Sequence, residues 1–398
     1  MRVFLLALAT FFAACTSGES NGQTGGVAQG APNTDFPPAF ENQTRAPEAR
    51  SNVTIDVQEI AQGLDHPWAI VFLPDGRMLV TERAGRLRIV TREGRISAPI
   101  TGLPEVRAHG QGGLLDVVLG PSFANDRMIY WSYVEPRSDG SGTTVARGWL
   151  NDAATRVEHI QVIFRQEPAA RAGGHHGSRL VFDRAGRLYI TLGERQRPET
   201  RPLAQDNSTL LGKIVRINAD GTVPADNPFM GQANVRPEIW SYGHRNVQGA
   251  DLDPETGALW IVEHGPQGGD ELNIPQAGRN YGWPLICYCE DYGGAPMVES
   301  PVREGMEQPI YYWDPVIAPG DMDFYRGDLF PWRGDILVAG LRSQQLVRLR
   351  LQNERVVGEE RFALGVGRIR DVAESEDGAL WIITDEDNGR ILRLMPRR

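Results

Sequence analysis

The chain has 398 residues, of which 41% are hydrophobic and 23% charged, proportions typical of a globular protein with a large buried core. These proportions exclude a collagen-like, coiled-coil or largely disordered chain. Its 41 Lys and Arg are outnumbered by 51 Asp and Glu, and the formal net charge of −10 argues against a nucleic-acid partner bound by phosphate neutralisation. The 45 Gly predict many tight turns.

Residues 1–15 have the pattern of an export signal. One basic residue, Arg2, precedes an apolar run too short to span a bilayer, and small residues follow. The ending Phe12-Ala13-Ala14-Cys15 is similar to a bacterial lipoprotein cleavage site, which predicts a lipid anchor at Cys15, with plain secretion as the alternative. In both cases we predict a periplasmic or other extracytoplasmic location. No later segment is long and apolar enough to cross a membrane.

Residues 16–52 are rich in Gly, Ser, Asn, Gln, Thr and Pro and poor in hydrophobic residues. Such a segment buries too little surface to offset the entropy lost on ordering. We therefore predict a flexible tether over 16–52, followed by one folded domain over 53–398.

Short alternating strands separated by Gly-containing turns dominate the chain after residue 52. In the unit over residues 67–90, Asp75-Gly76 and Ala84-Gly85 are the hairpin turns that join three strands. The strand–turn–strand pattern recurs at 179–191, 251–262 and 371–384, with weaker copies at 114–133 and 322–349. Six such units predict an all-β, six-bladed β-propeller with long inter-strand loops, because stacked blades cover the hydrophobic face that each unit exposes.

Long turn-rich loops between these units collect residues that do not resemble scaffold. Taken singly, each has a plain structural explanation, since a lone His or Arg more often stabilises a fold than performs chemistry. Adjacent residues on a strand also point to opposite faces, so one metal ion bound by neighbouring histidines is not expected. The combination is harder to dismiss, because propeller loops on one face converge near the axis. Four of the seven His lie in these Gly-rich loops, close to Arg and carboxylate residues: His175, His176, His244 and His264.

Two cysteines, Cys287 and Cys289, remain apart from Cys15. They are either a pair of small, half-buried residues or a disulfide spaced by one residue, which an oxidising compartment permits. A metal site on two sulfurs without a second pair is the weakest of the alternatives.

Six motifs follow one another along the chain: Gln-x-Gly-Leu-Leu at 111–115, His-x-x-x-Arg at 175–179, Gly-His-Arg-Asn-x-Gln-Gly at 243–249, Glu-x-Gly-Pro at 263–266, Asn-Tyr-Gly-Trp-Pro at 280–284 and Arg-x-Arg-Asp at 368–371. With them, the chain from about residue 63 to 394 resembles the soluble pyrroloquinoline-quinone (PQQ)-dependent aldose sugar dehydrogenases, the glucose/sorbosone dehydrogenase family of six-bladed propellers.

The resemblance implies a set of cofactor ligands. PQQ carries three carboxylates, which guanidinium groups bind in a bidentate manner. By position, Arg245, Asn246, Arg368 and Arg370 would hold the cofactor. Arg342 stands where the family usually has Lys, so the charge is kept while the reach and geometry change.

The resemblance also implies the catalytic residues. His175 would remove the anomeric hydroxyl proton of the sugar as hydride passes to the quinone, and Glu194 would orient that His. Gln111 would reach toward the same site. His176 is the alternative base, because the adjacent pair leaves the register uncertain by one residue.

Two calcium sites follow from the same resemblance. The backbone oxygens of Gly265 and Pro266 would hold a calcium ion that also binds the cofactor, since calcium takes oxygen ligands. The residues that align with a second, structural calcium are Glu271, Tyr281 and the stretch containing Cys287, Cys289 and Asp291.

The function implied is that of an exported quinoprotein, monomeric or homodimeric, which oxidises aldoses to lactones and passes electrons to a membrane quinone or cytochrome. A calcium-dependent lactonase-like hydrolase, or a binding propeller without chemistry, is the alternative. A hydrolase has no need of the arginine pair Arg368 and Arg370, and a binding module has no need of Gln111, His175 and Glu194 together.

Overall fold

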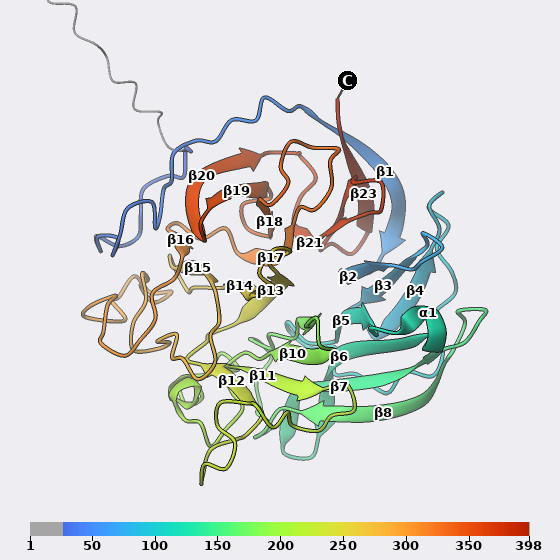
Figure 1. Cartoon of the computed structure of the whole chain (residues 1–398), viewed down its shortest axis with the longest axis horizontal. Helices are drawn as coiled ribbons and strands as arrows, with labels where there is room; N and C mark the ends of the chain where they lie inside the picture. The colour runs from blue at the N-terminus through green and yellow to red at the C-terminus, as the bar shows by residue number, and fades with distance from the viewer. Residues whose placement is uncertain (1–26, 398) are drawn as a thin grey trace, which may run out of the picture.

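The computed structural model describes residues 27–397 (Figure 1), so the predicted signal at 1–15, the predicted anchor at Cys15 and residues 16–26 lie outside the described residues. The described part contains 23 strands, a four-residue α-helix, α1 (Phe123–Asp126), and a short 3-10 helix over Arg201–Gln205. Within residues 27–397, no helix has the length and apolar character needed to span a bilayer.

Six small antiparallel sheets stand around a central axis in Figure 1, which confirms the prediction of an all-β, six-bladed propeller. Blade 1 has three strands and each of the other blades has four. In order from the axis outward, the strands are β2 (Pro67–Phe72), β3 (Met78–Glu82) and β4 (Arg86–Val90) in blade 1; β5 (Leu114–Leu119), β6 (Met128–Arg137), β7 (Gly140–Leu150) and β8 (Val157–Arg165) in blade 2; β9 (Leu180–Phe182), β10 (Arg187–Thr191), β11 (Lys213–Asn218) and β12 (Ile239–Tyr242) in blade 3; β13 (Val247–Leu252), β14 (Leu259–Glu263), β15 (Asp270–Asn273) and β16 (Tyr311–Trp313) in blade 4; β17 (Pro319–Phe324), β18 (Ile336–Gly340), β19 (Leu346–Gln352) and β20 (Arg355–Phe362) in blade 5; and β21 (Ile369–Glu374), β22 (Leu380–Thr384), β23 (Gly389–Pro396) and β1 (Ile55–Leu64) in blade 6.

The hydrophobic core lies between neighbouring blades. Strand β3, for example, is buried along its whole length, because the neighbouring blades cover both faces of its sheet. One cluster joins blade 1 to blade 2 through Trp68, Leu79, Leu114 and Trp131. The uncovered face of each repeat is therefore buried by the next repeat, as in other repeat folds.

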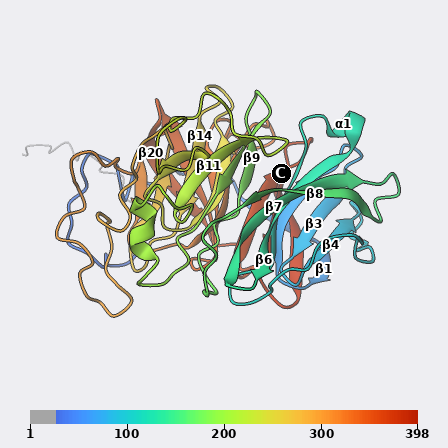
Figure 2. The ribbon, with the colours of Figure 1, turned by 90° about the horizontal axis from the view of Figure 1, so that it is seen from below.

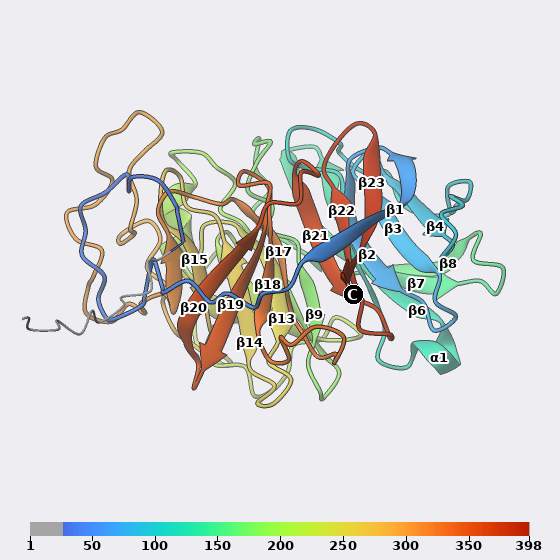
Figure 3. The same ribbon diagram turned by 90° about the horizontal axis from the view of Figure 1, so that it is seen from above.

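The ring is closed by the two ends of the described chain. Strand β1 pairs antiparallel with β23, from Ile55 opposite Pro396 to Leu64 opposite Gly389, and so becomes the outermost strand of blade 6. This pairing is visible at the right of Figure 3, where β1 crosses to lie beside β23. Closure in this way leaves no long unpaired strand edge between the first and last blades.

Residues 27–52 differ from the predicted flexible tether, because they pack along the outside of blades 4 and 5 (Figure 1). The side chain of Gln43 is fully buried and donates to the carbonyl oxygen of Pro309 at 2.9 Å. The backbone N–H of Asn33 donates to Asp314 at 2.8 Å, and that of Ala49 to the carbonyl oxygen of Glu359 at 2.9 Å. Specific polar contacts hold this N-terminal arm in place, together with the burial of Ala46 in the hydrophobic core of blades 4 and 5.

The two faces of the disc carry different connections. The innermost strand of each blade begins on one face, where long loops precede β5 and β9, and ends on the other, where short turns follow β2, β9, β13 and β21. The longest excursion, residues 274–310 between β15 and β16, projects sideways from the ring beside the N-terminal arm in Figure 2 and Figure 3.

Candidate active site

The long loops meet near the axis around a cavity of about 130 Å³, here called the axial pocket. All six blades contribute to its wall. The lining residues are Trp68, Arg83, Gln111, Leu115, His176, Gly177, Gln248, His264, Ala318, Leu341, Arg368, Arg370 and Asp385.

The axial pocket is cationic, because three guanidinium groups face a single carboxylate. Arg370 is buried, and donates to Gln248 Oε1 at 3.1 Å and to Asp385 Oδ2 at 2.8 Å, while its Nε has no partner. Burial acts to raise the pKa of Asp385, but the ion pair with Arg370 outweighs it and holds that pKa well below its usual range. Arg368, half-exposed, lies 3.5 Å from the same carboxylate. An uncompensated positive charge around a buried cavity suits a polyanionic ligand.

A buried His–Glu pair lies next to this pocket. Nδ1 of His175 is 2.6 Å from Oε1 of Glu194, and the side chains are 3% and 0% exposed. The backbone N–H of His175 donates to Gln111 Oε1 at 2.8 Å. His175 also has a φ of +48°, a left-handed conformation that non-glycine residues adopt at a cost. The structure therefore brings the three predicted catalytic residues, His175, Glu194 and Gln111, into direct contact.

The environment of this pair favours a neutral imidazole. Burial lowers the pKa of His175 well below its ordinary value, and the nearby cation of Arg245 acts in the same direction. Burial raises the pKa of Glu194 to about 7. When Glu194 is ionised it accepts the Nδ1 hydrogen, which leaves the Nε2 lone pair of His175 free to take a proton.

The adjacent His176 has no such partner. Both of its ring nitrogens are buried without a hydrogen bond, although the residue lines the axial pocket. Of the two other histidines in the predicted constellation, His244 lies between Ser241 and Glu263, and His264 bonds the carbonyl oxygen of Pro319 at 2.7 Å. An orienting carboxylate thus distinguishes His175 from His176.

A second, narrower cleft shares His264 with the axial pocket and contains Arg245. The guanidinium of Arg245 donates at 2.9 Å to the carbonyl oxygens of both His264 and Gly265, and lies 5.2 Å from the ring centroid of Trp283. It also donates to the hydroxyl of Tyr292 at 3.0 Å. The sequence analysis missed Tyr292, because a single Tyr in a Gly-rich loop carries no motif.

Two predicted cofactor ligands are placed differently from the others. Oδ1 of Asn246 accepts from the backbone N–H of Gly177 and from the amide of Gln248, so it ties the loops of blades 3 and 4 together. Arg342 is exposed, and its side chain contributes to the lining of neither cavity, although the neighbouring Leu341 does. The carbonyl oxygen of Leu341, directly before Arg342, lies 3.5 Å from Nη1 of Arg368, and the role of Arg342 as a cofactor ligand stays a prediction.

The residues of the first predicted calcium site, Gly265 and Pro266, line the Arg245 cleft. The carbonyl oxygen of Gly265 faces the guanidinium of Arg245, so this oxygen already has a polar partner. Within residues 27–397, no cluster of three or more His, Cys, Asp or Glu side chains is placed to hold a metal ion. A calcium site here would therefore depend on backbone oxygens, which is a shell that calcium accepts.

Three of the residues predicted for the second calcium site lie at the same cleft. Burial and the neighbouring carboxylate of Glu263 raise the pKa of Glu271 to about 8. Tyr281 donates its hydroxyl to the carbonyl oxygen of Ile274 at 2.6 Å, and Asp291 lies 3.5 Å from Arg201. Glu271, Tyr281 and Cys287 line the cleft.

Cys287 and Cys289 form a disulfide, with a Cα–Cα distance of 5.2 Å, and both are buried. Of the alternatives left open by the sequence, the structure contains the disulfide. The disulfide packs against the loop that contains Gly268 and Gly269. The approach is so close that a side chain on Gly269 would meet the Cβ atom of Cys289.

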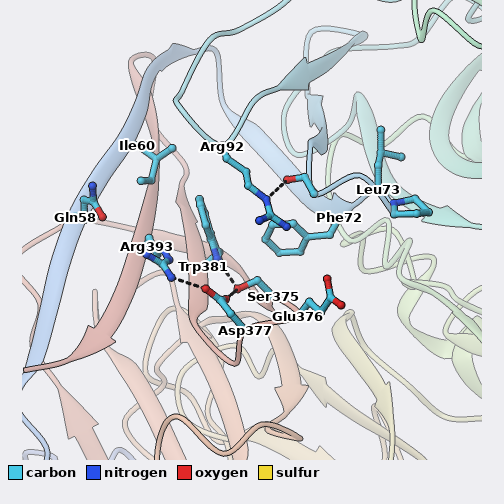
Figure 4. A pocket seen from close by; sticks show the side chains of 12 residues that line it. Gln58, Ile60, Phe72, Leu73, Arg92, Ser375, Glu376, Asp377, Trp381 and Arg393 are labelled. Carbon is cyan, nitrogen blue, oxygen red and sulfur yellow. Dashed lines mark hydrogen bonds and ion pairs between the residues drawn. The ribbon is translucent and has the colours of Figure 1, made fainter.

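A larger cavity, of about 440 Å³, lies on the opposite face between blades 6 and 1 (Figure 4). Several of its polar groups are paired: Arg393 pairs with Asp377 at 2.5 Å, and the indole of Trp381 donates to Ser375 at 2.9 Å. Arg92 donates to the carbonyl oxygen of Gly76 at 3.3 Å. The chemistry-bearing loops therefore surround the smaller cavity on the axis.

Comparison with known proteins assigns the class. A family model for glucose/sorbosone dehydrogenases matches residues 64–393, so the chain belongs to the glucose/sorbosone dehydrogenase family. This finding confirms the resemblance carried by the six motifs.

Individual relatives agree with this assignment. Aldose sugar dehydrogenase YliI of Escherichia coli is 45% identical over 350 residues, which cover 86% of this chain and 94% of the relative. The crystal structure of the soluble aldose sugar dehydrogenase from Escherichia coli, in the apo-form, superimposes with a TM-score of 0.83 over 86% of this chain and 100% of that chain. The PQQ-bound form of aldose sugar dehydrogenase from Streptomyces coelicolor is 29% identical, with a TM-score of 0.73 over 87% of this chain and 99% of that chain.

Proposed function

We propose that this protein is a PQQ-dependent aldose sugar dehydrogenase that oxidises the anomeric hydroxyl of its substrate to a lactone. The observation that carries the proposal is the contact between the two halves of the site. A buried His–Glu pair adjoins a pocket in which three guanidinium groups face one carboxylate. The first suits proton removal from a sugar hydroxyl, and the second suits a cofactor that bears three carboxylates.

The cofactor-binding residues are Arg368 and Arg370 in the axial pocket and Arg245 in the adjoining cleft, joined by Arg83, which the sequence analysis did not select. The Nε atoms of Arg245 and Arg370 are buried without a partner, and an anionic ligand would satisfy them. Arg342 and Asn246 contribute less directly, Asn246 by holding the loop at Gly177 in place.

PQQ, when bound, would supply the hydride acceptor for the anomeric carbon, and calcium would supply a Lewis acid at the same site. His175 removes the proton from the anomeric hydroxyl through Nε2. Glu194 holds the Nδ1 hydrogen and stabilises the imidazolium that forms, while Gln111 fixes the backbone of His175.

Calcium would be held by the backbone oxygens of Gly265 and Pro266, of which the Gly265 oxygen also accepts a hydrogen bond from the guanidinium of Arg245. A second, structural calcium would draw on Glu271, Tyr281 and the segment of Cys287, Cys289 and Asp291. Its presence would favour an ionised Glu271, whose pKa burial raises to about 8 in the metal-free protein.

Location and partners belong to the same proposal. The signal-like residues 1–15 support an extracytoplasmic, periplasmic protein, with Cys15 as its lipid anchor. Electrons would pass from the reduced cofactor to a membrane quinone or a cytochrome, and the protein would act as a monomer or homodimer.

The proposal is tested with purified, metal-free protein that is reconstituted with PQQ and calcium and offered a panel of aldoses and an artificial dye. We expect dye reduction that needs the protein, PQQ and an aldose together, with a lactone as the product. Hydrolysis of a lactone with calcium alone, without dye reduction on any aldose, would instead support the hydrolase alternative. Binding of sugar with neither reaction would support a binding propeller.

A further inference from the structure

One residue of the six motifs, Arg179, has no part in the proposed reaction, yet it lies on the propeller axis. It ends the His-x-x-x-Arg motif, directly before β9 of blade 3, and is only 6% exposed. Its guanidinium contacts each of the five other blades. The partners are Asp116 at 3.2 Å, Asp321 at 3.1 Å, Asp371 at 3.5 Å, the carbonyl oxygens of Gln248 at 3.0 Å and Gly320 at 3.2 Å, and the ring of Trp68 at 4.5 Å.

Two of these partners belong to the wall of the axial pocket. Trp68 and Gln248 both line it, and Arg179 lies behind them. Gln248 in turn accepts a hydrogen bond from Arg370 at 3.1 Å and donates to the carbonyl oxygen of Gly177 at 3.2 Å. Displacement of Arg179 would therefore reach the proposed cofactor ligand Arg370 through one intervening residue.

Arg179 also ends the loop that carries the proposed base. In this loop, φ is +48° at His175 and +96° at Ser178, conformations that persist only where surrounding contacts enforce them. The backbone N–H of Arg179 donates to Thr191 Oγ1 at 2.9 Å, and its side chain is tied to the axis. The loop thus has a fixed end four residues after His175.

We propose that Arg179 is a positioning residue that closes the axis beneath the pocket and holds Gln248 and the His175 loop in their active geometry. The inference rests on the proposed function, because its catalytic consequence concerns the same site. A guanidinium is suited to this role, since its planar fork reaches carboxylates and carbonyl oxygens on several sides at once, whereas an ammonium is a compact point charge.

Arg348 supplies a matched control. It is also buried, pairs with Asp335 at 2.6 Å and Glu360 at 2.5 Å, and lies 5.5 Å from the ring of Trp332, but it lies at neither cavity of the site. Arg179→Lys and Arg348→Lys therefore make the same chemical change, at the axis and in the scaffold. Both are expected to lower the melting temperature.

In the reconstituted enzyme, we expect Arg179→Lys to lower kcat about 10- to 100-fold at saturating PQQ, as a small misplacement of catalytic groups does, with less effect on the KM for the aldose. We expect it also to weaken PQQ binding, measured by tryptophan fluorescence, about 10-fold, the effect of losing one charge-assisted hydrogen bond. Arg348→Lys should leave both quantities at the wild-type level. Equal values of kcat and PQQ affinity in the two variants would overturn the proposal.

Hydrogen exchange separates failure of this inference from failure of the proposed function. Faster exchange of the backbone amides of residues 175–180 and 248 in Arg179→Lys than in Arg348→Lys supports the positioning role even if the wild type binds no PQQ. Equal exchange contradicts it. If Arg179→Lys does not fold, Arg179→Met with Asp321→Asn, which removes one carboxylate together with the cation, is measured in the same way.

Discussion

The chain reverses direction by different means on the two faces of the propeller. On the face opposite the axial pocket, an Asp side chain closes the turn after the innermost strand in four blades: Asp75, Asp183, Asp253 and Asp377 each accept a backbone N–H two residues later. The positive φ angles of these turns fall on glycines such as Gly76 and Gly378. Non-glycine residues with positive φ occur on both faces: His175, Ser178, Arg195 and Gln196 lie in loops of the pocket face, and Arg127, Asn353 and Glu354 lie in turns of the opposite face.

This difference between the two faces distinguishes the structural turns of the scaffold from the loops that form the candidate site. Turns on the first face satisfy part of their backbone hydrogen bonding with their own Asp side chains. Loops on the second face leave buried nitrogens of Arg245, Arg370 and His176 without partners and hold strained backbone. Such costs persist only where distant segments enforce them, and they are typical of sites prepared for a ligand.

The largest expected effect of a substitution on the pocket face is that of His175→Ala. Because His175 is the proposed base, we expect kcat to fall about 10²- to 10⁴-fold in the reconstituted enzyme. PQQ binding should remain, since His175 does not line the axial pocket. Dye-reduction kinetics and fluorescence titration measure the two effects. A larger loss of activity from His176→Ala would move the assignment of the base to His176.

Removal of a pocket guanidinium comes next. Arg370→Met deletes a buried charge that binds Gln248 and Asp385, and we expect the Kd for PQQ to rise about 10- to 100-fold, as the loss of one or two charge-assisted hydrogen bonds predicts. Arg393→Met, on the opposite face, is the control and should leave the Kd unchanged. Equal effects of the two substitutions would remove the functional distinction between the faces.

The pH dependence of the reaction gives a smaller, graded effect. Burial raises the pKa of Glu194 to about 7. Below that pH the carboxyl is protonated and donates to Nδ1 of His175, so Nε2 carries the hydrogen and cannot accept a proton. We therefore expect kcat/KM to fall about tenfold per pH unit below about pH 7. Glu194→Gln should abolish this fall in kcat/KM at low pH while lowering activity at all pH values. A fall that survives the substitution would show that another group titrates.

The smallest expected effect belongs to the turn face. Asp253→Ala removes the acceptor for the backbone N–H groups of Glu255 and Thr256, and we expect about 1 kcal/mol lower stability in urea unfolding. Dye reduction by the reconstituted variant should match that of the wild type. A substantial loss of activity here would show that the two faces are coupled.

The fold was predictable from the sequence because turn chemistry is local. The repeated Asp-Gly or related turns at Asp75, Asp377 and their equivalents mark the blades without any knowledge of distant contacts. The N-terminal arm was not predictable in this way. Its composition indicates too little hydrophobic burial, whereas Gln43 and Asn33 bind polar partners that lie more than 260 residues away in the sequence.

The site was predictable only as far as its motifs reach. His175, Glu194, Arg245 and Arg370 belong to ordered motifs or follow from their resemblance, and the structure places them around adjoining cavities. The role of Arg342, whose charge matches the family position, stays a prediction.

Residues without a motif were inaccessible to sequence reasoning. Tyr292 and Arg83 join the site only through the packing of loops from separate blades. The hydroxyl of Tyr292 is the third partner of Arg245, and the two residues are 47 positions apart in the sequence. No local pattern determines the path of the chain between them.

Closure of the ring by β1 and β23 has a consequence for biosynthesis. Asp56 and Arg397, paired at 2.7 Å, are separated by 341 residues, so the first strand of the domain has no partner until the last one has been made. Contacts of such long range form late in folding, after the local hairpins of the inner blades. A chain that stops short of β23 would thus keep β1 as an exposed edge, prone to aggregation, and could not complete the ring that brings Arg370 opposite Gln248. We therefore expect chains that end before β23 to be inactive.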